Sequence, residues 1–253
     1  MARHSLSLSL RACAIAAVCI APTAPAVAAN YTWKTLSGTG NWTDSVNWSG
    51  TSATNLYPGS VGSGTADGAF IQAIYTSAPT INLDTSVQIR QLNLGGTTGA
   101  NTFPVTLSTS NGSTLTFTQT TATGTAVLAV NASVNSGTNR LTPDVLVTAA
   151  TWETRMASVT SGTVNLIVSS NVSAGSTGNK IVRYTPNNTS TTTAPSFLEF
   201  TGNITNGSSG GTVSMYYRND MPNSPNTLKL SGTGNTFTNG ITFVGGTTGI
   251  AIL

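Results

Sequence analysis

The sequence predicts an all-β protein built as a solenoid of stacked turns, with a β-sandwich as the alternative. Short runs that alternate apolar and polar residues recur along the chain, and Gly, Asn, Ser and Thr separate them. Charged residues make up 7% of the chain, against about 25% in ordinary globular domains. Repeated turn–strand units that bury one face on their neighbours form a solenoid with few charges inside. Two peptides recur at the borders of expected strands: Leu-Ser-Gly-Thr-Gly-Asn at residues 36–41 and 230–235, and Gly-Gly-Thr-Thr-Gly at residues 95–99 and 245–249.

The first 29 residues have the pattern of an export signal. Arg3 and Arg11 give a basic start, residues 12–21 are apolar, and residues 26–29 offer small side chains to a signal peptidase. We place the cleavage after Ala29, with Ala28 as the neighbouring choice. A short N-terminal anchor helix is the alternative, but the apolar run is shorter than the roughly 20 residues that span a membrane.

Removal of this signal changes the chemistry available to the chain. It removes both cysteines, the only histidine and two of the ten basic residues, which leaves eight basic against seven acidic residues. Ser-His-Asp and Cys-His catalysis and zinc binding through thiol or imidazole are therefore excluded. We expect no metal, no cofactor, no nucleic-acid partner, which would need a basic stripe, and no membrane span after cleavage, since no later run reaches about 18 apolar residues.

Residues 30–118 form the first expected region of the mature chain. It opens with Trp33, Trp42 and Trp48 in a stretch rich in turn-forming residues. Val87–Leu94 alternates apolar and polar residues, which predicts a half-buried strand. Further short strands are expected at residues 69–74, 80–83, 103–107 and 114–118.

Residues 119–253 form the second expected region, which continues as a β-solenoid. Residues 149–157 are the one plausible helix of the mature chain, because Trp152 and Met156 lie four residues apart. Strands are expected at residues 126–134, 144–150, 162–172, 180–184, 197–200, 213–217, 227–230 and 239–244, with a further short one at Ile204.

Two stretches carry a family resemblance. Gly-Asn-Trp at residues 40–42, Asn-Trp at 47–48, Pro58, Ala-Asp-Gly-Ala-Phe at 66–70 and the strand at Val87–Leu94 resemble the opening of large bacterial autotransporter-type passenger proteins. Leu-Lys-Leu-Ser-Gly-Thr-Gly-Asn-Thr-Phe-Thr-Asn-Gly at residues 228–240 is similar to their autotransporter-associated β-strand repeat. We place this repeat at about residues 226–253.

The resemblance implies a right-handed parallel β-helix that is exported by the export machinery past the inner membrane. It implies a structural or adhesive protein at the cell surface, associated with the outer membrane, or secreted, and not an enzyme. The presence of a single repeat copy suggests a truncated member or a piece of a longer product, which as a fragment would remain in the periplasm. A stack that ends on an apolar strand offers an open edge, so we expect end-to-end self-association.

Aromatic residues are the candidate contacts for cell-surface or extracellular polymers and glycans. Trp33, Trp42, Trp48 and Tyr216 could stack on sugar faces, which makes a secreted carbohydrate-binding module the alternative function. For the three tryptophans we favour a structural role, in which they cap the first turn of the stack. Adjacent strand residues point to opposite faces, so at most one of Tyr216 and Tyr217 can face a given ligand.

An enzyme is the third hypothesis, because polysaccharide lyases use the β-helix fold. Glu153 and Arg155 lie two residues apart and are the closest local candidates for such chemistry. An ion pair on a solvated strand face is the simpler interpretation, and we expect no catalytic residue. Asp44 and Asp67 are expected to be turn or cap residues, because no calcium-loop pattern surrounds them.

Overall fold

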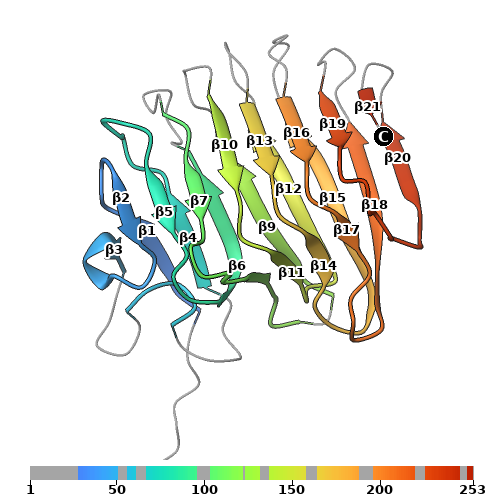
Figure 1. Ribbon diagram of the computed structural model, residues 1–253, viewed down its shortest axis with the longest axis horizontal. Helices are drawn as coiled ribbons and strands as arrows, with labels where there is room; N and C mark the ends of the chain where they lie inside the picture. Colours follow the sequence, from blue (N-terminus) through green and yellow to red (C-terminus); the bar gives the residue numbers. More distant parts are fainter. Residues whose placement is uncertain are drawn as a thin grey trace, which may run out of the picture.

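A computed structural model describes residues 28–50, 56–60, 67–95, 103–121, 123–131, 137–157, 164–187, 196–219, 226–245 and 250–252. In this part of the chain the only helical element is the 3-10 turn η1, Ser45–Asn47. The strands are stacked side by side along one long axis, in the order in which the chain reaches them (Figure 1).

The strands form three faces of a coil. The long face contains β1 (Asn30–Trp33), β4 (Asp67–Ile71), the C-terminal half of β6 (Val87–Leu94), β9 (Thr125–Val130), β12 (Thr151–Ala157), β15 (Gly178–Asn187), β18 (Gly211–Asn219) and β20 (Ile241–Gly245). The eight-strand face contains β2 (Thr39–Asn41), β5 (Thr80–Asn82), β7 (Thr106–Ser108), β10 (Thr138–Leu141), β13 (Val164–Val168), β16 (Ser196–Phe200), β19 (Thr227–Leu230) and β21 (Ile250–Ile252). The short face starts on the N-terminal half of β6 and continues with β8 (Leu115–Phe117), β11 (Val145–Val147), β14 (Val172–Ala174) and β17 (Ile204–Thr205).

Successive turns are joined by parallel pairing. The chain passes from the long face to the eight-strand face and then to the short face, and it repeats this path in the turns β6–β8, β9–β11, β12–β14 and β15–β17. The prediction of an all-β parallel β-helix is confirmed. The β-sandwich alternative is wrong, since a sandwich is built from antiparallel strands. The one antiparallel pair in the described part joins β1 to β3 (Trp48–Ser49) at the N-terminal end.

Inward side chains stand in register from one turn to the next. On the eight-strand face Ile81, Leu107, Leu141, Val168 and Phe200 occupy successive positions of one column. Each of these side chains is at most 1% exposed, and burying one such side chain stabilises a fold by about 1.5–3 kcal/mol. Val and Ile are common at the inward positions because β-branched side chains pack well on a pleated surface.

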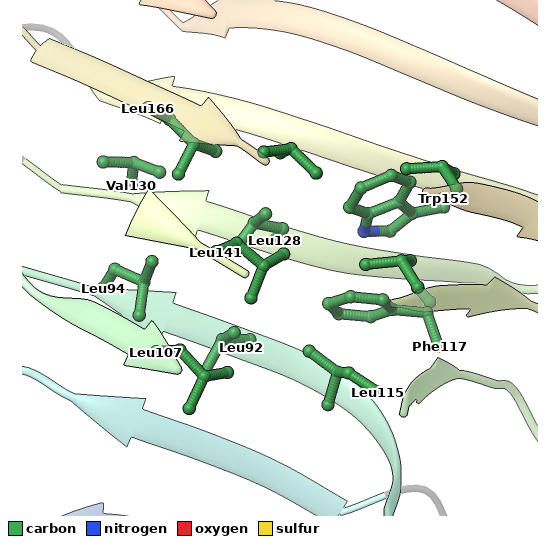
Figure 2. Close-up of a cluster of buried hydrophobic side chains, with 14 of the residues drawn as sticks. Leu92, Leu94, Leu107, Leu115, Phe117, Leu128, Val130, Leu141, Trp152 and Leu166 are labelled. Carbon is green, nitrogen blue, oxygen red and sulfur yellow. The ribbon is translucent and has the colours of Figure 1, made fainter. Parts of the chain in front are cut away.

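Aromatic rings pack together in the interior of the middle turns. Trp152 stacks on Phe117 with ring centroids 5.1 Å apart and meets Phe200 edge-on at 6.2 Å. The close-up shows Trp152 and Phe117 together at one side of a layer of leucine and valine side chains (Figure 2). One apolar core therefore runs through several turns.

Residues 149–157 correct the sequence prediction. The expected helix is instead strand β12, Thr151–Ala157. Trp152 and Met156 are both buried, but positions four apart share one face in a strand as well as in a helix. The segment forms a strand because it pairs with β9 on one side and with β15 on the other.

The recurring peptides do not occupy equivalent places in the coil. Residues 36–41 lead into β2, and Gly38 in that copy has φ of +75°. Residues 230–235 follow β19 and form a turn, in which a Cβ on Gly232 would lie 2.4 Å from the Gly202 carbonyl oxygen. The residues before Ala28 and most of the Gly-Gly-Thr-Thr-Gly copies lie outside the described residues. No helix in the described part is long and apolar enough to cross a membrane.

Close stacking at the corners predicts a strong effect for one small substitution. A Cβ on Gly207 would lie 1.8 Å from the carbonyl oxygen of Ala174 in the turn below. Gly207→Ala must therefore push two turns apart, and we expect it to lower the free energy of unfolding by about 1–3 kcal/mol. Ser209→Ala, at an exposed position two residues away, should change it by less than about 0.5 kcal/mol. Urea denaturation of both variants measures the difference, and equal effects would contradict this stacking.

Candidate functional site

The stretch from Trp33 to Trp48 closes the N-terminal end of the coil. Trp33 and Trp48 meet edge-on with ring centroids 5.0 Å apart, and Trp42 meets Trp48 at 4.9 Å. The Trp42 indole N–H donates to the Pro58 carbonyl at 2.9 Å, and the Trp48 indole N–H donates to the Trp42 carbonyl at 2.8 Å. Two of the three indole donors are therefore satisfied inside the cap.

The three tryptophan rings are buried in this cap. Trp33 is 1% exposed and both Trp42 and Trp48 are 0% exposed. A Cβ on Gly40 would lie 2.8 Å from the Trp33 ring, so a residue without a side chain is needed beside it. In this arrangement no ring offers a face on which a sugar could stack, and a glycan contact through these rings would require the cap to open.

Tyr216, the fourth aromatic candidate, lies on the outer surface of the long face. Its neighbour Tyr217 points inward, is 4% exposed and packs on Tyr184 with ring centroids 5.4 Å apart. Burial raises the pKa of the Tyr184 phenol far above its usual range. Only Tyr216 of the pair is placed to contact a ligand outside the coil.

Tyr216 belongs to a cluster of charged and aromatic side chains that we call the arginine patch, which comprises Glu153, Arg155, Arg183, Tyr216 and Arg218. The patch spans three consecutive strands of the long face, β12, β15 and β18. Register places Glu153 beside Arg183, and Arg183 beside Tyr216. Three of the eight basic residues that follow residue 29 are in this patch.

Glu153 organises the arginine patch. Its side chain is 8% exposed, and Oε2 accepts from Nε of Arg155 at 2.8 Å and pairs with Nη2 at 2.6 Å. Its other oxygen, Oε1, accepts from the Thr185 hydroxyl at 2.8 Å and lies 3.9 Å from Nη1 of Arg183. The predicted Glu153–Arg155 ion pair is present, but Glu153 is buried rather than solvated.

Arg183 is held between the carboxylate and an aromatic ring. Its guanidinium carbon lies 5.1 Å from the centroid of the Tyr216 ring, within the range of a cation–π contact. The Nε atom of Arg183 is buried and makes no hydrogen bond. The contacts with Glu153 and Tyr216 limit the rotamers that the Arg183 side chain can adopt.

The arginine patch carries an excess of positive charge. The guanidinium groups of Arg155 and Arg183 share the single carboxylate of Glu153, so these three side chains together carry one net positive charge. The Arg155 side chain is 50% exposed and that of Arg183 is 28% exposed, so both are accessible from the solvent. Planar guanidinium groups fit carboxylate, sulfate and phosphate oxygens in a two-pronged geometry. The patch is therefore suited to an anionic ligand.

A second ion pair lies on the eight-strand face and differs in its charge balance. Glu199 pairs with Lys229 at 2.9 Å and accepts from the Ser231 hydroxyl at 2.7 Å. The hydrogen bond from Ser231, and then the contact with Lys229, hold the pKa of the Glu199 carboxyl below its usual range. One charge balances the other there, so this pair does not offer the surplus positive charge found in the arginine patch.

The sequence alone paired Glu153 with Arg155 and singled out Tyr216, but it did not link the two groups and missed Arg183, which lies between them. The strands that carry these residues lie about thirty residues apart in the sequence, and only the register between strands brings the side chains together. The local sequence does not determine that register. In the described part no group of three or more His, Cys, Asp or Glu side chains could hold a metal ion.

No protein-family model, curated protein or solved structure matches this chain. The structure therefore defines the class of protein by itself. The chain is a parallel β-solenoid with a tryptophan-filled cap at its N-terminal end and an arginine patch on its long face.

The buried cap predicts a structural role for Trp42. Trp42→Ala should leave a cavity and an unpaired Pro58 carbonyl, and we expect it to lower the free energy of unfolding by about 3–5 kcal/mol. Val46→Ala is the matched control, because Val46 lies in the same segment and is 77% exposed. Thermal denaturation followed by near-ultraviolet circular dichroism measures both. A Trp42→Ala variant as stable as the control would show that the ring is not part of the folded core.

Proposed function

We propose that this chain is an exported, non-enzymatic protein with a structural or adhesive role, similar to bacterial autotransporter passenger proteins. Three features support the proposal: the signal-like first 29 residues, the passenger-like peptides at both ends of the mature chain, and the parallel β-helix. We place its action at the cell surface or outside the cell. The stacked coil provides a stiff, elongated scaffold on which a binding surface can be displayed.

The observation that carries the adhesive role is the arginine patch, and the partner we propose is an anionic polymer such as an acidic polysaccharide. Strands in neighbouring turns are about 4.8 Å apart, so Arg155 and Arg218, two turns apart, sit about 10 Å apart along the coil axis. Arg183 lies on the strand between them. A chain molecule with regularly spaced carboxylate or sulfate groups could contact all three turns at once.

The same geometry favours binding over catalysis. Glu153 accepts hydrogen bonds from Arg155 and Thr185, so its carboxylate is engaged and poorly placed to act as a free general base. The patch contains one carboxylate, whereas glycoside hydrolysis uses two. Arg155 and Arg183 are held by Glu153, which reduces the side-chain entropy that they lose on binding.

Charge removal tests the binding proposal. An Arg155→Gln/Arg183→Gln double variant should bind an immobilised polyuronate or sulfated polysaccharide at least about tenfold more weakly, since each charge-assisted hydrogen bond contributes roughly 1.5–3 kcal/mol. The affinity of the unaltered protein should also fall by roughly threefold to tenfold when the salt concentration rises from about 0.1 to about 0.5 M, because salt screens exposed charges. Biolayer interferometry measures both effects.

The control for this test is Arg140→Gln on the eight-strand face. Arg140 is exposed on β10 and its substitution removes one positive charge from a different face of the coil. It should leave polysaccharide binding unchanged. Equal loss in this variant would show that net charge alone matters, and equal binding of neutral and acidic polymers would refute the proposed ligand class.

A further inference from the structure

Asp67 is a buried acid at the first position of strand β4. The residue is 2% exposed. Its Oδ1 accepts from the backbone N–H of Ala29 at 2.9 Å, and its Oδ2 accepts from the backbone N–H of Gly59 at 2.9 Å. No Lys or Arg of the described residues forms an ion pair with it. A buried carboxylate with only neutral donors is expensive to desolvate.

Ala29 binds the first turn of the coil through its backbone. Its carbonyl oxygen accepts from the backbone N–H of Gly68 at 2.8 Å, which extends the pairing between β1 and β4 by one residue. Its side chain packs against the core, whereas Ala28 is exposed. Cleavage after Ala29 would remove both the donor to Asp67 and the acceptor for Gly68. Cleavage after Ala28 would keep both.

We propose that the export signal is cleaved between Ala28 and Ala29, one residue before the position expected from the sequence alone, and that the new α-ammonium group of Ala29 forms an ion pair with Asp67. This inference rests on the proposed export of the chain. Water hydrolyses the Ala28–Ala29 peptide bond, the carboxylate remains on Ala28, and the released amine of Ala29 takes up a proton. Residues 26–28, Ala-Val-Ala, have the small residues that signal peptidase requires before the cut.

Cleavage at this bond places a positive charge next to Asp67. Before cleavage the Ala29 nitrogen is a neutral amide that donates one hydrogen bond to the carboxylate. After cleavage the same nitrogen, which lies 2.9 Å from Oδ1 in the uncleaved chain, carries a positive charge. The cap of the mature chain is thereby stabilised more than the cap of the precursor, so signal removal strengthens the fold at the end where it occurs.

The identity of the mature N-terminus is the first test. The protein is expressed with its own signal in a bacterial host, and intact mass and N-terminal sequencing are applied to the exported form. A chain that begins at Ala29 supports the proposal, and a chain that begins at Asn30 overturns it. Absence of any exported, shortened form would instead count against the proposed function.

Stability of defined chains is the second test and does not require export. Chains that begin at Ala28, Ala29 and Asn30 are released from a cleavable tag and unfolded in urea. We expect the Ala29 chain to be the most stable, with an unfolding equilibrium constant at least about tenfold smaller than that of either neighbour. A chain beginning at Asn30 that is equally stable would overturn the ion pair.

Acetylation separates the effect of the N-terminal charge on stability from the effect of the additional residue. N-acetylation of the Ala29 chain should raise its unfolding equilibrium constant about tenfold or more, and it should have no such effect when Asp67→Asn is also present. Should Asp67→Asn fail to fold, the rate of acylation of the Ala29 amine in the folded chain replaces it. That rate should be well below the rate for the exposed amine of the Ala28 chain, and equal rates would contradict the proposal.

Discussion

The structure depends on one constraint: each inward side chain must stand above the corresponding side chain of the turn before it. Parallel pairing fixes the register between turns, so a residue that faces inward in one turn determines what the next turn can hold. The column from Ile81 to Phe200 follows from this rule. The corners obey it as well, because asparagine side chains bind the backbone of the next turn: Asn171 accepts from Asn203 at 3.1 Å, and Asn203 accepts from Gly234 at 2.8 Å.

The constraint also explains why the outer surface is where function can reside and why the two ends differ. Inward positions are committed to packing, whereas outward positions on adjacent turns can be chosen independently, and register then brings them together. The arginine patch is such a set, drawn from three turns and anchored by Glu153. At the first turn the column is closed by buried tryptophans, and at the last described turns Phe243 continues the Tyr184–Tyr217 column while remaining 51% exposed.

The local pattern of the sequence was sufficient for the class of fold and for single strands, but not for what lies between turns. Val87–Leu94 has the predicted bounds, although its alternation is interrupted at Arg90 and Gln91, where the strand passes from the short face to the long face. Residues 149–157 were predicted wrongly, since Trp152 and Met156 fit both a helix and a strand and only pairing with β9 and β15 separates the two. Arg183 could not be linked to Glu153 and Tyr216 for the same reason: the link is a register between strands, and register is set by packing of the whole stack.

The most direct test of in-register parallel stacking is a set of nuclear Overhauser contacts from strand β12 in the folded chain. The account predicts contacts from Thr154 to Leu128 on one side and to Tyr184 on the other, together with contacts between the Trp152 and Phe117 rings, whose centroids lie 5.1 Å apart. Strands in such a sheet are about 4.8 Å apart, close enough for these contacts to be observed. Helical contacts three or four residues apart within Thr151–Ala157, or antiparallel partners for β12, would contradict it.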